Sequence, residues 1–178
     1  MSEDRAPLLV LGLGDRLLTD DGFGLVLLAK LRRIHGEDPG IEFMDGGTLG
    51  AALLGELEGR RGILILDTVA GGQPGEVMRV NDPLARSSSQ GVGAYGTSAS
   101  LLLGAASLVD WLPERVVVIG ATPLVSKTGV GLSIPLRMAL PPTLELAQET
   151  LAELRAAVES DRPVASTAAS SSSTRYVR

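Results

Sequence analysis

The sequence predicts an α/β fold with a mostly parallel sheet of about five strands. Short, almost purely apolar segments alternate with segments whose apolar residues recur at helical intervals. Such continuous apolar segments are typical of strands buried on both faces, and their alternation with helices favours parallel crossovers. Of the 178 residues, 44% are hydrophobic and only 3% aromatic, so we expect a single, mainly aliphatic core.

The predicted elements follow in order along the chain. Leu8 to Leu13 is an apolar segment ended by glycines and predicts the first strand, and GFGLVLLAKLRRI after it predicts a helix with basic residues in its last turns. Further strands are expected at 41–44, 62–66, 76–80 and 115–119, and further helices at 49–57 and 98–111. A last helix is expected to begin near Pro142. We assign residues 1–160 to a single domain and 161–178 to a disordered Ser/Ala-rich tail.

Composition excludes several classes of function. The net charge of -5 and the absence of a Lys/Arg cluster argue against a nucleic-acid partner. There is no cysteine, which excludes disulfides, thiolate zinc sites and a cysteine nucleophile. The first residues, MSEDRAP, are polar and acidic, and no apolar segment reaches the roughly 20 residues of a membrane span. We therefore expect a cytoplasmic protein without a membrane partner.

The segment GLGDRLLTDDGFG lies between the first strand and the first helix, where dinucleotide-binding folds carry three glycines. Gly12 and Gly14 match that pattern, but Leu17 occupies the third position. Asp20 and Asp21 follow, and their charges would repel a pyrophosphate. The segment therefore argues against nucleotide binding.

Carboxylates follow the predicted strands at the edge where open α/β sheets place their ligand sites. Asp67 ends the strand GILILD, and Asp21 precedes the first helix, so the two are expected to converge. Purely structural roles remain open, because Asp20 or Asp21 would also serve as a helix cap and Asp67 would also brace a turn. Asp45 ends the second strand in the same way, but Gly46 and Gly47 make a turn role equally reasonable.

The single histidine, His35, lies at the far end of the first helix, away from the strand ends. It is therefore expected neither to complete a Ser-His-Asp triad nor to bind a metal at that edge. At the end of a helix its ordinary role is to interact with the last carbonyl groups.

Five segments, taken together and in this order, resemble the successive blocks of the hydrogenase maturation endopeptidase family. They are VLGLGDRLLTDDGFG, FMDGGTLGAALLGELEG, ILILDTV, VVVIGATP and GVGLSIPLRMALP. The resemblance extends from Leu8 to about Val158. It implies a three-layer αβα sandwich around a twisted sheet. It also implies a protease, a peptide-bond hydrolase that removes a C-terminal extension from the precursor of a nickel-iron hydrogenase large subunit after nickel insertion.

The resemblance also implies roles for particular residues. Family members recognise nickel through an acidic residue at the start of the first helix, an aspartate ending the third strand and a histidine before a later helix. The first two match Asp21 and Asp67, which are thus the candidate catalytic and metal-binding residues. The stretch GVGAYGTSASLLLG contains no histidine, and Tyr95 stands closest to the expected place. A phenol is a poor nickel ligand, so the nickel is expected to arrive with the substrate.

Another departure from the family pattern is Asp15, which stands where the family has an asparagine and adds negative charge near the expected site. Two other functions remain open. Without the histidine, the chain would serve as an assembly partner that binds the large subunit without cutting it. A small-molecule-binding domain would use the same crevice, because a fold does not determine a function.

Overall fold

The computed structural model describes residues 5–84 and 97–161. A sheet of five strands forms its centre, in the order β2-β1-β3-β5-β4. The strands are β1 (Leu8–Leu13), β2 (Ile41–Gly47), β3 (Gly62–Thr68), β4 (Val77–Asn81) and β5 (Arg115–Ala121). β2, β1, β3 and β5 are parallel, whereas β4 pairs with β5 in the antiparallel sense. The predicted α/β class and mostly parallel sheet are therefore confirmed.

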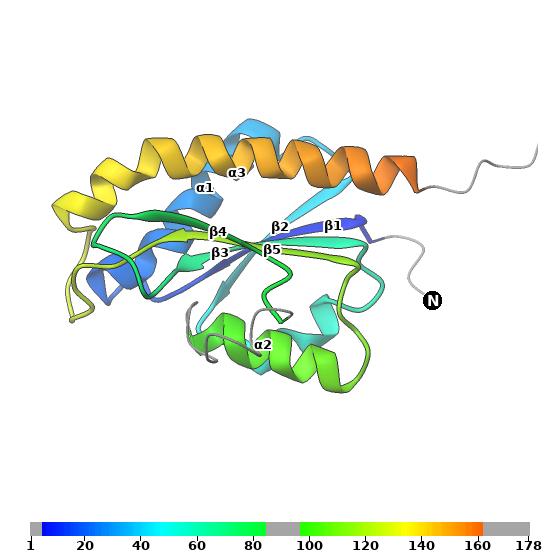
Figure 1. Ribbon diagram of the computed structural model, residues 1–178, viewed down its shortest axis with the longest axis horizontal. Helices are drawn as coiled ribbons and strands as arrows, with labels where there is room; N and C mark the ends of the chain where they lie inside the picture. The colour runs from blue at the N-terminus through cyan, green and yellow to red at the C-terminus, as the bar shows by residue number, and fades with distance from the viewer. Residues whose placement is uncertain (1–4, 85–96, 162–178) are drawn as a thin grey trace, which may run out of the picture.

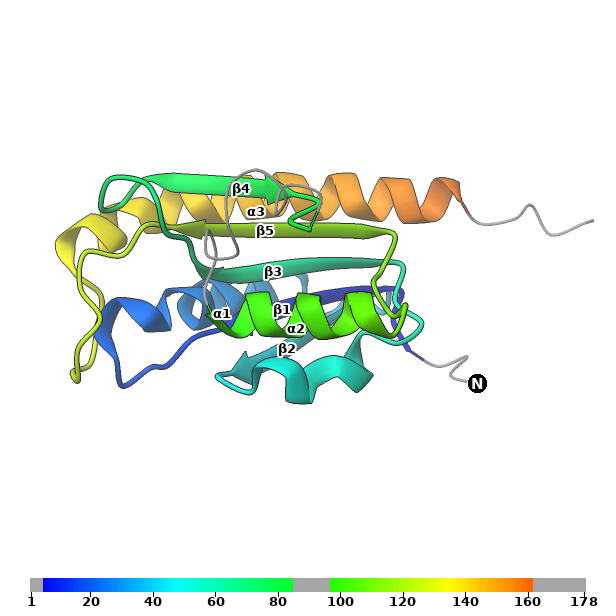
Figure 2. The same ribbon diagram turned by 60° about the horizontal axis from the view of Figure 1, so that its bottom comes forward.

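Helices cover both faces of this sheet, which gives three layers (Figures 1 and 2). α1 (Phe23–His35) and α3 (Ile134–Ser160) pack on one face, and α2 (Thr97–Leu108) and the 3-10 helix η2 (Gly50–Glu56) pack on the other. Every residue of β1 and of β3 is buried, as their apolar composition predicts. No helix within 5–84 and 97–161 is both long enough and apolar enough to cross a membrane.

The last helix begins eight residues before the predicted Pro142, at Ile134, so that prediction is wrong. Pro141 and Pro142 lie inside the helix, although a proline there removes a backbone hydrogen bond. The first turns are retained because Leu136 and Ala139 are buried in the core. The Thr143 hydroxyl also donates to the carbonyl of Ala139 over 2.6 Å.

Two further expectations are modified by the structure. The helix expected at 49–57 is instead the 3-10 helix η2. Leu53 and the following Leu57 are its buried leucines, and a short 3-10 segment is enough to place them in the core. The tail prediction falls almost entirely on residues 162–178, which lie outside the described part of the chain.

Candidate active site

Two carboxylates lie at the carboxyl edge of the sheet, beside the adjacent parallel strands β1 and β3. Asp21 belongs to the 3-10 turn η1 (Thr19–Gly22) between β1 and α1, and Asp67 is the sixth residue of β3. η1 contacts β3, and the negative charge of Asp21 contributes to the raised pKa of Asp67, so the two residues are near one another. The predicted convergence of this pair is therefore present in the fold.

A tight turn holds Asp21. Gly14 adopts a φ of 122°, which L side chains rarely adopt, and a Cβ there would lie 1.8 Å from the Asp21 carbonyl oxygen. The Asp15 amide donates to Asp21 Oδ2 over 2.8 Å, and Asp15 Oδ1 accepts the Leu17 amide over 2.8 Å. The Asp15 side chain thus closes the turn, and its backbone orients the Asp21 carboxylate.

Asp67 is a buried carboxylate with only 2% of its surface exposed. Its Oδ1 accepts the Thr68 amide over 2.7 Å, whereas its Oδ2 is buried and has no hydrogen-bond partner among the described residues. Burial raises the pKa of Asp67 to about 7, and the charge of Asp21 acts in the same direction, against the opposing effect of the Thr68 hydrogen bonds. The turn-bracing role expected for Asp67 thus uses only one of its two oxygens.

This arrangement has two chemical capabilities. A carboxyl group with a pKa near neutrality exchanges a proton readily, and two ionised carboxylates offer oxygen ligands to a divalent cation. Within the described residues, no group of three or more His, Cys, Asp or Glu side chains is placed to hold a metal ion.

The other candidates have different surroundings. Asp45 is exposed, forms an ion pair with Arg16 at 2.8 Å and accepts the Gly47 amide over 3.1 Å, which is the turn role considered for it. Tyr95 lies outside the described residues. His35 is the last residue of α1, and Asp21 lies just before the first residue of this helix. The length of α1 therefore separates His35 from Asp21, as expected.

Asp20 has a role that the sequence did not indicate. The alternative that Asp20 or Asp21 caps the first helix is not what the structure has, since Gly22 is the N-cap of α1 and no side chain caps it. Asp20 is fully buried and accepts three backbone amides from the connection between β5 and α3, at Leu124, Val125 and Ser133. No local pattern signals a contact between residues more than 100 positions apart.

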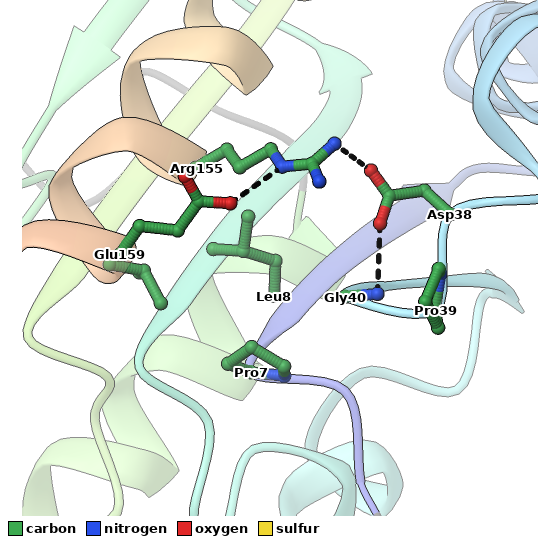
Figure 3. Close-up of a pocket in the computed structure, with 8 residues that line it drawn as sticks. Pro7, Leu8, Asp38, Pro39, Gly40, Arg155 and Glu159 are labelled. Carbon is green, nitrogen blue, oxygen red and sulfur yellow. Dashed lines mark hydrogen bonds and ion pairs between the residues drawn. The ribbon is translucent and has the colours of Figure 1, made fainter. Parts of the chain in front are cut away.

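A separate pocket of about 350 Å³ lies where β1 begins and α3 ends (Figure 3). The Arg155 side chain lies between Asp38 and Glu159 and pairs with both, and Asp38 also accepts the Gly40 amide over 2.9 Å. The charged side chains that line this pocket therefore form ion pairs with one another. The pocket is at the opposite edge of the sheet from Asp21 and Asp67.

Sequence comparison identifies relatives of known class. The model of the hydrogenase maturation protease family matches residues 26–150. The chain is 31% identical to the hydrogenase expression/formation protein HupD of Bradyrhizobium diazoefficiens over 150 residues, 82% of this chain and 78% of that protein. It is 27% identical to the hydrogenase 2 maturation protease of Escherichia coli strain K12, over 83% of this chain and 90% of that protein.

Solved structures give the same result. The hydrogenase maturating endopeptidase HybD from E. coli is similar with a TM-score of 0.68 and 27% identity, covering 84% of this chain and 93% of that chain. A hydrogenase 2 maturation peptidase from a Thaumarchaeota archaeon is similar with a TM-score of 0.61 and 29% identity, covering 82% and 97%. Together with the extent of the family match, these similarities show that the chain belongs to the hydrogenase maturation protease family.

Proposed function

We propose that this protease removes the C-terminal extension of a nickel-iron hydrogenase large-subunit precursor, and that Asp21 and Asp67 engage the nickel carried by that precursor. Membership of the family supports the substrate class. The observation that carries the nickel proposal is the buried Oδ2 of Asp67, which has no hydrogen-bond partner among the described residues and lies near a second carboxylate.

A buried oxygen without a hydrogen-bond partner, such as Asp67 Oδ2, raises the free energy of the folded protein. A metal ion that binds this oxygen when the substrate docks would offset that free-energy cost. Nickel in the precursor has ligands of its own, and two carboxylates complete its coordination without a third side chain from this chain. Binding of the metal requires the ionised form of Asp67, so its proton leaves when the precursor docks.

Docking through the metal also positions the scissile peptide bond, which reduces the entropic cost of its hydrolysis. A carboxylate or the precursor's own nickel then activates the attacking water, whose proton goes to the departing amine. Because an empty precursor lacks the nickel that the two carboxylates recognise, cleavage would report that metal insertion is complete. We propose that this reaction takes place in the cytoplasm, as expected for a sequence that contains no cysteine.

The test is to incubate the purified protein with nickel-loaded, unprocessed large subunit and to follow the mass of the subunit. We expect loss of a C-terminal peptide with nickel and none without it. Stable binding without a change in mass would contradict the protease proposal and favour the non-catalytic assembly partner.

The two carboxylates are tested in the same assay. Asp21→Asn and Asp67→Asn are each expected to lower the cleavage rate by about 100-fold or more. Removing a residue that only hydrogen-bonds to a metal ligand already lowers metal affinity or activity by about 10- to 100-fold, and a ligand itself should matter at least as much. Asp38→Asn, which alters a hydrogen-bonded carboxylate at the opposite edge of the sheet, serves as the matched control. Normal cleavage by both site variants would refute the assignment.

A further inference from the structure

The buried carboxylate of Asp20 holds the connection between β5 and α3 against the turn that carries Asp21. Asp20 Oδ2 accepts the amides of Leu124 and Val125 over 2.9 and 3.0 Å, and its Oδ1 accepts the amide of Ser133 over 2.6 Å. Burial alone would raise the pKa of Asp20, but the hydrogen bonds from Ser133, Val125 and Leu124 outweigh that effect and keep it lowered. Both ends of the connection are thus tied to one ionised side chain.

Thr19, the residue before Asp20, adds a second set of contacts to the same connection. Its hydroxyl donates to the Val125 carbonyl over 3.0 Å and accepts the Lys127 amide over 3.3 Å, while its own amide donates to the Gly129 carbonyl over 3.0 Å. Thr19 has a φ of 46°, an unfavourable conformation for a β-branched residue. Such a conformation persists only where the surroundings enforce it, and it is found most often at functional sites.

The connection between β5 and α3 starts next to Asp67. Gly120 and Ala121, the last residues of β5, pair with Asp67 and Thr68 of β3. In Figures 1 and 2 this connection and the one between β1 and α1 lie side by side at the same end of the molecule. A continuous set of bonds therefore runs from Asp67 through β5 and this connection to Asp20, whose neighbour is Asp21.

We propose that Asp20 is a positioning residue that fixes the Asp21 carboxylate relative to Asp67. The inference rests on the proposed function, because it takes Asp21 and Asp67 as the working pair. The two adjacent aspartates therefore have different roles. Asp21 contacts the precursor, and Asp20 acts through Asp21 without touching the precursor.

Hydrogen exchange tests the positioning without any cleavage assay. Asp20→Asn keeps the size of the side chain but replaces one carboxylate oxygen with an NH2 group, which cannot accept a backbone N–H. The remaining oxygen is neutral and accepts less strongly, so exchange of the Leu124, Val125 and Ser133 amides is expected to accelerate, by about tenfold or more where the acceptor is lost. Exchange of the Asp15 amide, which donates to Asp21 Oδ2 over 2.8 Å, should accelerate as well, because it reports the place of the Asp21 carboxylate.

If the exchange rate of the Asp15 amide is unchanged while the Leu124, Val125 and Ser133 amides exchange faster, Asp20 only anchors the connection between β5 and α3, and the proposal is overturned.

Thr19→Val, which removes the hydroxyl and keeps the shape, is a second and milder variant should Asp20→Asn not fold. It is expected to accelerate exchange at Lys127 and, to a smaller degree, at Asp15. Asp38→Asn is the matched control and should affect the Gly40 amide without affecting Asp15.

A double-mutant cycle on binding of the nickel-loaded precursor tests whether Asp20 acts through Asp21. Asp20→Asn is expected to weaken binding by about tenfold in the wild-type background and by less than about twofold in the Asp21→Asn background. Equal effects in both backgrounds would overturn the proposal. If the wild type binds the precursor without cutting it, the proposed protease function fails and the cycle still decides the role of Asp20. If it does not bind, hydrogen exchange alone decides that role.

Discussion

At the scale of single residues, the chemistry of Asp67 follows from its burial at the end of a central strand. Burial favours the neutral form of a carboxyl group in this place, because the described residues leave Asp67 Oδ2 without a hydrogen-bond partner while Thr68 binds the other oxygen. The apolar strand around it is visible in the sequence, and so is the aspartate. The pKa of about 7 is not, because it depends on how completely the layers on both faces exclude water and on the nearby Asp21.

This burial makes stability depend on pH. The pKa of Asp67 rises from 3.8 in water to about 7 in the folded protein, so the folded state binds more protons than the unfolded state between these values. The contribution of Asp67 to the free energy of unfolding is therefore largest below about pH 4 and falls as pH rises through 7, by about 4 kcal/mol at most.

Urea unfolding of the wild type and of Asp67→Asn at several values of pH measures this contribution. The difference in unfolding free energy between the two proteins should change in favour of the variant as pH increases from about 4 to about 8. A difference that does not depend on pH would show that Asp67 is not buried in its neutral form.

At the scale of elements, close packing of α1 against the strand ends sets the place of the site. A Cβ on Gly24, in the first turn of α1, would lie 2.2 Å from the Leu66 carbonyl oxygen and 2.5 Å from that of Leu13. Leu66 lies two residues before the end of β3 and Leu13 is the last residue of β1, so the helix begins in direct contact with the strands that flank the site. Gly24 therefore permits the close approach of helix and strand that the third glycine provides in dinucleotide-binding folds, where this chain has Leu17.

Replacement of Gly24 tests this packing. Gly24→Ala is expected to destabilise the protein by about 1–3 kcal/mol, because the added methyl group meets backbone atoms that cannot move aside. Gly104→Ala, in α2, is the matched control: nothing lies within 4 Å of the added Cβ, so a gain of about 0.5–1 kcal/mol is expected. Thermal or urea unfolding compares the two, and equal effects would contradict the close approach.

At the scale of the whole molecule, Arg60 links parts of the chain that lie far apart in sequence. Its side chain is fully buried and donates to the Ala6 carbonyl over 2.6 Å, to the Glu56 carbonyl over 3.1 Å and to the Glu42 carboxylate. These partners belong to the segment before β1, to the end of η2 and to β2. Arg60 thus stabilises the edge of the sheet opposite the active site.

Arg60→Met is expected to lower the free energy of unfolding by about 2–4 kcal/mol, because two partly buried carbonyls lose their donor and Glu42 loses its partner. The control is Arg115→Met, which removes a more exposed ion pair with Asp161 and should cost clearly less. Urea unfolding measures both. A loss no larger for Arg60 than for Arg115 would show that Arg60 does not hold these segments together.

The sequence by itself determined the approximate places of the strands, their alternation with helices and the two carboxylates of the candidate site, because apolar segments and the polar residues that follow them are local signals. The buried strands at Leu8–Leu13 and from Gly62 lie where their composition predicts. Only the tertiary structure decided that α3 begins before its prolines, since packing of Leu136 and Ala139 outweighs two missing hydrogen bonds. It also separated Asp20 from Asp21, because the amides that Asp20 binds come from residues more than 100 positions away. Contacts of that range arise from the folded chain and leave no mark on the local pattern.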